Sequence, residues 1–317
     1  MTRRFPPQEH PPQEQGAALI NVLVLVGVLA ALSTSLFDRM RTARHLDAGR
    51  SALDAARSAA LAAEPLLLAQ TMVGKAMTLP TPAGPATAMF APGGNCFNLN
   101  STAMGSAGRP ATRPLGMEQL ARLLTLIDVP TDEARRIAAA TADWIDADQQ
   151  PNPGGAEDPA YARAATPYRT GGTLLAEVSE WRAVAGVTPA LYAKARPHLC
   201  ALPEAELSRP NLNSLSPAAA PVIAAIADVP LVSAREAIAA RPAAGWASVA
   251  DFWAQPLLAG RSVAADALRQ PGTRDHYLAF RITAGASDLP FIETGLIAAG
   301  SAGRPARLLV RRWGEDE

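Results

Sequence analysis

The chain has 317 residues, of which 49% are apolar and 18% are charged, and its formal net charge at pH 7 is zero. This apolar content excludes a disordered chain, and zero net charge gives no general attraction to nucleic acids or other polyanions. Beyond an N-terminal apolar segment about 280 residues remain, which is enough for one or two globular domains.

Residues 17–37 carry no charge and follow a short polar leader that ends at Gly16. As a helix they would span roughly 31 Å, which matches the apolar core of a bilayer. The segment is too long for the apolar part of an ordinary secretory signal, and no small-residue cleavage motif is obvious past Ser35. We therefore expect one membrane-spanning helix with a processing site between Gly16 and Ala17. An uncleaved single-span anchor is the alternative.

The two cysteines, Cys96 and Cys200, lie far apart in a chain that has a membrane anchor. They predict one structural disulfide in an oxidising compartment, and two unpaired buried thiols are the alternative. The arginines near the apolar segment, taken alone, predict that the large domain lies in the cytoplasm, because more of them follow the segment than precede it. Those that precede it are Arg3 and Arg4, and those that follow are Arg39, Arg41, Arg44 and Arg50. We give the cysteines and the leader more weight than this count.

An apolar stripe at helical spacing continues beyond the apolar segment, at Leu46, Gly49, Leu53, Ala56, Ala60, Ala63 and Leu67. It predicts one helix over residues 17–64, with a kink or break at Pro65. We expect the stripe to pack on a domain rather than to bind a partner.

The remaining elements alternate between loops, helices and strands. Residues 80–116 and 149–172 are rich in Pro and Gly and predict loops, apart from a short strand at 95–100. The pattern from 117 to about 268 is helical. Three terminal strands, at 277–282, 291–297 and 306–313, predict an antiparallel sheet against the long helix.

A weak internal repeat lies within the helical region. Residues 126–137 are echoed by 226–238, and more loosely by 184–193. Each copy predicts two helices joined by a tight turn. Such hairpins can bind phosphate through a Gly-rich turn, but here the turns contain Asp128-Val129-Pro130 and Asp228-Val229-Pro230. Aspartate repels phosphate and proline lacks an amide donor, so we expect no contact with nucleic acid.

The densest acidic cluster lies at residues 143–158. Oxygen ligands gathered on a loop suit calcium, and we predict Asp146, Asp148, Glu157 and Asp158 as its ligands. The spacing is not that of an EF-hand, and a solvated acidic loop with Asp146 as a cap or turn residue is the alternative.

Catalysis has little support in the sequence. His45, His198 and His276 are isolated from one another, and no nucleophile elbow, phosphate-binding loop or zinc-helix motif is present. We therefore expect no enzyme activity and predict no catalytic residue.

Several segments together resemble the type II secretion system protein K family, minor pseudopilins of the general secretion pathway in Gram-negative bacteria. The resemblance covers nearly the whole chain. The matching segments are the leader and apolar helix, residues 143–148, 155–161, 167–169, 177–182, 191–192 and 196–200, Asn211-Leu212-Asn213, and residues 248–252.

This resemblance implies an α+β, pilin-like fold in which the long helix packs on a small sheet and two SAM-like helical modules are inserted. It implies cleavage by prepilin peptidase after Gly16, N-terminal methylation, a calcium site in the acidic loop, and a periplasmic body anchored in the inner membrane. The implied partners are the minor pseudopilins I and J at the pseudopilus tip, the major pseudopilin filament and the inner-membrane assembly platform.

On this basis the predicted divisions are a leader (1–16), the membrane part of the helix (17–37), the first part of the pilin-like domain (38–102), two helical modules (103–210 and 211–272) and the terminal strands (273–317). Most pilins have Glu at the fifth mature position, where this chain has Asn21. A buried Glu needs a partner in the subunit above, so a neutral residue fits a position with nothing above it. A tolerated polar residue is the alternative.

Two other classes of function remain as alternatives to a pseudopilin. The hairpins would suit a membrane-anchored DNA-binding protein, and the acidic loop would suit a periplasmic calcium-dependent enzyme.

Overall fold

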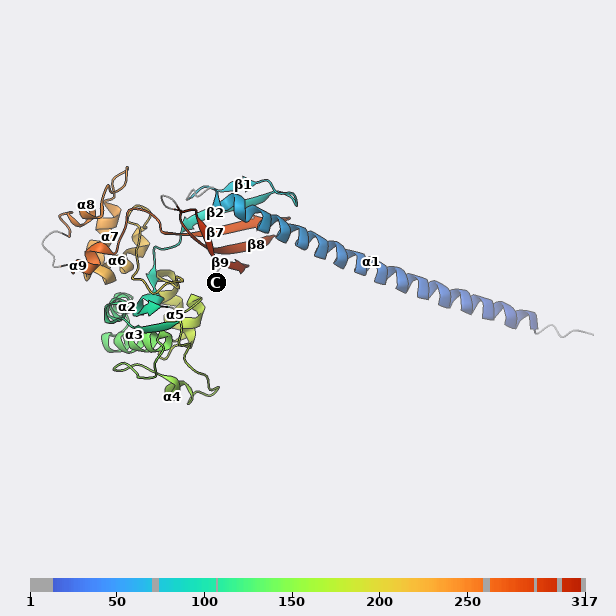
Figure 1. The fold of residues 1–317 in the computed structure, drawn as a ribbon. Coiled ribbons are helices and arrows are strands. Elements are labelled where there is room, and N and C mark those ends of the chain that lie inside the picture. The colour runs from blue at the N-terminus through green and yellow to red at the C-terminus, as the bar shows by residue number, and fades with distance from the viewer. Residues whose placement is uncertain are drawn as a thin grey trace, which may run out of the picture.

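The computed structural model describes residues 14–69, 74–106, 108–258, 263–287, 290–300 and 304–314. A long N-terminal helix projects from a body that contains a small sheet and two groups of short helices (Figure 1). The helix meets the sheet only near its C-terminal end, and the rest extends away from the body. The fold is α+β, as predicted.

The long helix, α1, runs from Glu14 to Leu68 and has 55 residues, which gives a length of about 80 Å. It begins before the predicted start because Glu14 and Gln15 are good helix formers. Pro65 lies inside its last turn, so the helix ends within one turn of the proline, near the predicted break.

A stripe of small residues packs α1 against the sheet. Ala56, Ala60, Ala63 and Leu67 are at most 4% exposed and lie in one apolar cluster with residues of the sheet such as Phe280. Alanine has no side chain beyond Cβ, so the helix axis lies close to the strands.

Only the second half of the predicted stripe packs on the sheet, because the sheet does not reach the first half. Leu46 is 61% exposed and Leu53 is 42% exposed. The expectation that the whole stripe packs on the domain is therefore wrong for its first half.

The sheet has five strands in the order β1-β2-β7-β8-β9, and every neighbouring pair is antiparallel. Its strands are β1 (Met77–Leu79), β2 (Ala86–Pro92), β7 (Tyr277–Ala284), β8 (Phe291–Ala298) and β9 (Arg307–Trp313). Phe280 lies opposite Gly295, where a Cβ would come within 2.1 Å of the Val310 carbonyl oxygen, so only glycine fits. The three terminal strands are present as predicted, and two early strands join them.

The expected loop over residues 80–116 is wrong, because β2 and three shorter strands lie within it: β3 (Phe97–Asn98), β4 (Ala103–Ser106) and β5 (Arg109–Thr112). Proline residues flank β2 rather than interrupt it, and its inward side chains include Ala86 and Ala88, which carry little strand signal. The strand predicted over 95–100 ends at Asn98, whose side chain accepts a hydrogen bond from the Asn100 amide and starts the 3-10 helix η1 (Leu99–Thr102).

Since β7 pairs directly with β2, everything between them is an insertion into the sheet. The first group of helices is α2 (Pro114–Leu126), α3 (Thr131–Ile145), α4 (Asp158–Tyr161), η2 (Val178–Ala183), α5 (Pro189–Ala195) and η3 (Arg196–His198). Their core centres on Trp181, which is fully buried and donates its indole hydrogen to Thr141 Oγ1 at 2.9 Å.

The second group is η4 (Pro217–Ala219), α6 (Ala220–Ala227), α7 (Leu231–Ala239), α8 (Val249–Trp253) and α9 (Ala265–Arg269). It has its own apolar cluster around Phe252, and α6 packs on α2 of the first group. The predicted helical stretch from 117 to 268 is thus broken by irregular segments, the longest being 162–177 and 201–216.

The chain enters and leaves the first group at one place. There β3 pairs in parallel with β6 (Leu199–Cys200), and Cys96 is bonded to Cys200. Two buried asparagines hold the same junction. Asn100 donates to the carbonyl oxygens of Leu175 and Leu202, and its own carbonyl accepts from the Leu175 amide. Asn98 donates to the carbonyls of Glu204 and Glu206.

Replacing Ala60 by leucine should destabilise the contact between α1 and the sheet, because Ala60 is fully buried there. Overpacking of this kind costs about 1–3 kcal/mol, measured as a shift in the urea midpoint by circular dichroism. Ser58→Leu adds a leucine to the exposed side of the same turn and should change stability by less than about 0.5 kcal/mol. An equal loss in both variants would contradict this account of the packing.

Candidate metal centre and membrane anchor

The acidic cluster forms where α3 ends. Asp143 lies in the last turn of α3, Asp146 directly follows that helix, and Glu157 directly precedes α4. The chain between them turns back at Gly154 and Gly155. Gly154 has a φ of +81°, and a Cβ on Gly155 would lie 1.9 Å from Asp143 Oδ2. The loop can therefore close on the helix end only with glycine at these positions.

Asp143 fastens this loop to α3. Its Oδ1 accepts hydrogen bonds from the Asn152 amide at 3.0 Å and from Asn152 Nδ2 at 2.5 Å, and its Oδ2 accepts one from the Ala156 amide at 2.7 Å. Asp146 Oδ2 accepts from Thr112 Oγ1 at 2.7 Å, and Thr112 in turn accepts from Asn152 Nδ2 at 3.0 Å. Thr112 and Asn152 thus connect the two aspartates and fix their orientation.

Three buried oxygen atoms in this cluster receive no hydrogen bond from the described residues: Asp146 Oδ1, Glu157 Oε1 and Glu157 Oε2. Asp143, Asp146 and Glu157 are each at most 2% exposed, and each offers an oxygen within 4.8 Å of those of the other two. Buried carboxylate oxygens without donors are costly unless a cation neutralises them. The geometry therefore fits a bound metal ion.

The protonation of the cluster reflects the same crowding. Burial, together with the charges of Asp146, Asp143, Asp148 and Asp158, raises the pKa of Glu157 to about 8. Burial raises the pKa of Asp146 to about 6, against the hydrogen bond from Thr112, which lowers it. Burial also raises the pKa of Asp143. A bound cation would favour the ionised forms and offset this cost.

The four predicted ligands do not all lie at this centre. Asp146 and Glu157 do. Asp148 is exposed and accepts a hydrogen bond from the Gln150 amide, and Asp158 accepts from the amide and the hydroxyl of Thr170, which holds the following loop. Both stay predicted ligands.

Asp143 was not among the predicted ligands, although it lies in the same acidic run. Its position three residues before Asp146 puts both carboxylates on one face of the helix end, and this spacing could have identified it.

α1 is the candidate membrane anchor. Among the described residues it is the one helix long and apolar enough to cross a membrane, with a mean hydropathy of 2.3 over its most apolar 18 residues, all of them exposed. Asn21 is an exposed polar residue within this stretch. Gly16 and Ala17 lie in the first turn of α1, while residues 1–13 of the predicted leader lie outside the described residues.

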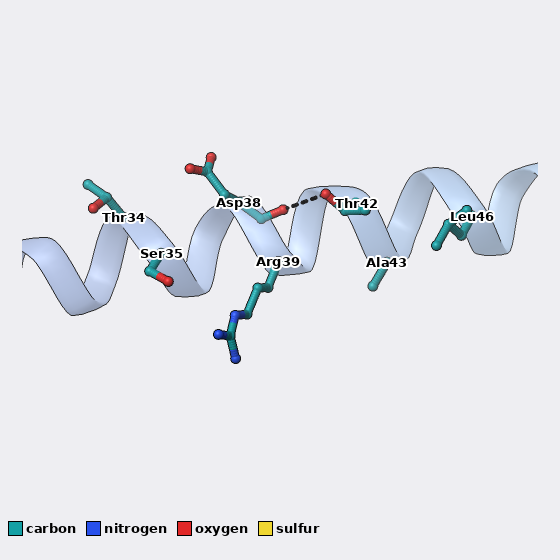
Figure 2. Close-up of a pocket in the computed structure, with 7 residues that line it drawn as sticks. All are labelled: Thr34, Ser35, Asp38, Arg39, Thr42, Ala43 and Leu46. Carbon is teal, nitrogen blue, oxygen red and sulfur yellow. Dashed lines mark hydrogen bonds between the residues drawn. The ribbon is translucent and has the colours of Figure 1, made fainter.

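The apolar stretch is followed by polar residues on an exposed part of α1. Figure 2 shows Asp38 and Arg39 pointing to opposite sides of α1, and Thr42 Oγ1 donating to the Asp38 carbonyl oxygen at 3.0 Å. Asp38 and Arg39 are the first charged residues of α1 after Glu14, and the boundary of a bilayer would fall here.

The two hairpins resemble each other in structure as well as in sequence. Asp128 joins α2 to α3 with a φ of 64°, and Asp228 joins α6 to α7 with a φ of 54°. Lys194 pairs with Asp128 at 2.8 Å, and Arg122 lies 3.5 Å from Asp228. Both turns therefore present a carboxylate where a phosphate-binding hairpin would present free amides.

Family models described as type II secretion system (T2SS), protein K match residues 95–204 and 210–272. The chain belongs to the type II secretion system protein K family. It is 33% identical over 272 residues to the type II secretion system protein K of Klebsiella pneumoniae, which covers 80% of this chain and 83% of that protein. The protein of the same name from Pectobacterium carotovorum subsp. carotovorum is 30% identical over 257 residues, covering 75% and 78%.

A solved structure of the family has the same fold. The chain matches, at a TM-score of 0.67 and 28% identity, the crystal structure of the GspK-GspI-GspJ complex from the enterotoxigenic Escherichia coli type 2 secretion system, covering 88% of this chain and 100% of that one. The first family segment contains both cysteines and the whole acidic cluster. The predicted domain boundaries stay predictions.

Replacing Asp143 by alanine should loosen the acidic loop even without metal, because three hydrogen bonds are lost and a buried amide at Ala156 is left unpaired. Losses of this kind cost about 1–3 kcal/mol. Urea unfolding in the presence of a chelator measures this effect. Asp148→Ala removes an exposed carboxylate from the same loop and should unfold as the parent does. A matching loss in that variant would show that Asp143 has no special role in fixing the loop.

Proposed function

We propose that this protein is a minor pseudopilin that sits at the tip of the pseudopilus with the minor pseudopilins I and J and starts its assembly for protein export across the outer membrane. The observation that carries this proposal is the match to a chain of the GspK-GspI-GspJ complex over 88% of this sequence. The role is one of assembly and contains no catalytic step.

The proposed location is the inner membrane, with a single span and the body in the periplasm. The exposed apolar part of α1 supports the anchor, and the Cys96–Cys200 disulfide supports an oxidising compartment for the body. The proposal also includes removal of the leader after Gly16 by prepilin peptidase and methylation of Ala17. Contacts with the assembly platform and the major pseudopilin filament belong to the same proposal.

Two features favour the end of a filament over its middle. Asn21 carries no charge that needs a partner from a subunit above. The inserted helices add a large body beside the sheet, which would crowd a filament if every subunit carried it (Figure 1). At the tip, one copy meets no such crowding.

The alternative of a membrane-anchored DNA-binding protein rests on the two hairpins, and their turns argue against it. Asp128 and Asp228 place carboxylates at both turns, and each is engaged by a cation of the protein itself. Phosphate would meet repulsion at both positions.

Binding of the pseudopilins I and J should depend on the part of α1 that is exposed and does not pack on the sheet. Leu46 and Leu53 lie two turns apart on one exposed face, so replacing both by aspartate should weaken co-purification with pseudopilins I and J while leaving the circular dichroism spectrum unchanged. Ser51→Asp is the control, since Ser51 lies off this face. If the wild-type protein, extracted from membranes, brings down neither partner, or if its mass still includes the leader, the proposed role fails.

We further propose that the acidic cluster holds a structural calcium ion, bound by Asp146 and Glu157 with Asp143 beside them. When bound, the ion would fix the loop between α3 and α4 by neutralising the carboxylates. Calcium accepts carbonyl and water ligands to complete its coordination, which suits an irregular loop.

Calcium should raise the melting temperature of the protein relative to a chelator. At a calcium concentration 100 times the Kd the gain is about 2.7 kcal/mol. Glu157→Gln should remove this gain without unfolding the metal-free protein, because the substitution also removes a buried charge. Glu118→Gln, on the exposed side of α2, is the matched control and should keep the gain. A wild-type melting temperature that calcium does not change would rule out the site.

A further inference from the structure

A second buried acidic contact lies far from the metal centre, where α1 crosses the edge of the sheet. Glu64 of α1, Glu293 of β8 and Arg311 of β9 meet there. The side chain of Glu293 is fully buried, that of Glu64 is 12% exposed and that of Arg311 is 39% exposed. Two carboxyl groups and one guanidinium therefore share a site that holds little water.

Arg311 is committed to Glu64. Its Nε donates to Glu64 Oε1 at 2.5 Å and its Nη2 donates to Glu64 Oε2, which makes a two-pronged ion pair. Glu293 Oε1 lies 3.6 Å from Arg311 Nε, beyond hydrogen-bond distance, and neither Glu293 oxygen receives a hydrogen bond from the described residues. The charge of Glu293, if ionised, would have no close partner of its own.

The carboxyl groups of Glu64 and Glu293 converge on one nitrogen, because Arg311 Nε lies 2.5 Å from Glu64 Oε1 and 3.6 Å from Glu293 Oε1. Two ionised carboxylates are both acceptors and cannot bond to each other. The contact is favourable only when one proton lies between them, as in other close carboxyl pairs.

Arg311 is the charged group that acts on both carboxyl groups of this pair. From α1 the nearest cation on the same face is Arg57, whose guanidinium lies 5.2 Å from the ring centre of Trp313. From β9, Arg311 is the group already described. The faces of β2 and β7 that contact α1 are apolar, with Ala88, Phe90, Phe280 and Ile282.

We propose that Glu64 and Glu293 share one proton that fastens α1 to the edge of the sheet, and that loss of this proton as the pH rises loosens the contact and lets the body pivot on its anchor. The device is independent of the metal centre and of the binding partners.

The direction of the pH dependence follows from proton linkage. Burial and, next to it, the neighbouring carboxyl group of Glu64 raise the pKa of Glu293 to about 8, against the charge of Arg311, which lowers it. When α1 leaves the sheet, Glu293 is exposed and returns to its ordinary pKa near 4.5. The docked form thus holds one more proton than the undocked form between these values. The contribution of Glu293 to the contact is fully present below pH 4.5, falls as the pH rises, and is lost above about pH 8. The pKa of Glu64 is lowered in the docked form, so its own contribution is lost at low pH, and the contact is strongest near pH 4.5.

Hydrogen exchange of the full chain in detergent micelles tests the linkage. Protection of the α1 residues that face the sheet, expressed relative to unstructured peptide, should fall by about tenfold per pH unit between pH 5 and 8 and then level off. Glu293→Gln should abolish this slope, because its amide can donate to Glu64 as the protonated acid does. Glu64→Gln should also abolish it, because Glu293 could then ionise beside Arg311.

Glu177→Gln is the matched control. It breaks the ion pair of Arg312, the neighbouring residue on β9, at 2.7 Å, without touching the carboxyl pair, and it should keep the slope. A flat wild-type profile, or a slope that survives in Glu293→Gln, would overturn the proposal.

Infrared spectroscopy gives a test that does not depend on how the pair variants fold. In a Glu157→Gln background, which removes the other glutamate that titrates near pH 8, the carbonyl band of a protonated carboxylic acid should be present at neutral pH and disappear with a midpoint near 8. Absence of that band at neutral pH would show that the pair holds no proton.

Discussion

The structure depends on one contact between the two ends of the chain. A stripe of alanines on α1 lies against a sheet whose central strands come from both termini, since β2 pairs with β7. Without that pairing, α1 and β2 would not be joined to the terminal strands, and the inserted helices would not be enclosed by one sheet. The small side chains of Ala56, Ala60 and Ala63 allow the close approach of α1 to the sheet.

The inserted helices pack around cores that are separate from the core of the sheet. Each group of helices has a separate apolar cluster, and the two groups meet where α2 contacts α6. The acidic centre belongs to the first group alone, and its aspartates are held by Thr112 at the end of β5 and by Asn152 of the loop after α3. Sheet and insertion are also joined by side chains: Arg312 of β9 pairs with Glu177 beside η2. A change at the metal centre would therefore act on the helical body first and reach the anchor only through such links.

Sequence patterns predicted the parts whose signal is local. The uncharged run at 17–37, the alternation in β7 to β9 and the echo between 126–137 and 226–238 each lie within one segment. β1 and β2 were missed because β1 has only three residues and the alanines and proline of β2 give little strand signal, so that their strand conformation comes from pairing with a distant segment. Asp146 and Glu157 could be chosen from composition, and the three-residue spacing between Asp143 and Asp146 could have added Asp143. The contact of Glu64 with Glu293 joins residues from opposite ends of the chain, which no pattern in either segment indicates.

The position of the disulfide has a mechanical consequence. Cys96 and Cys200 lie where the chain enters and leaves the first group of helices, 104 residues apart in sequence and 5.7 Å apart between their Cα atoms. A tensile load applied along the backbone would pass through the sulfur bridge and bypass everything enclosed between the two cysteines. If such a force pulled the sheet away from the second group, the backbone between Cys96 and Cys200, which contains the acidic centre, would carry none of it. The second group, which has no such bridge among the described residues, would be the element that stretches first.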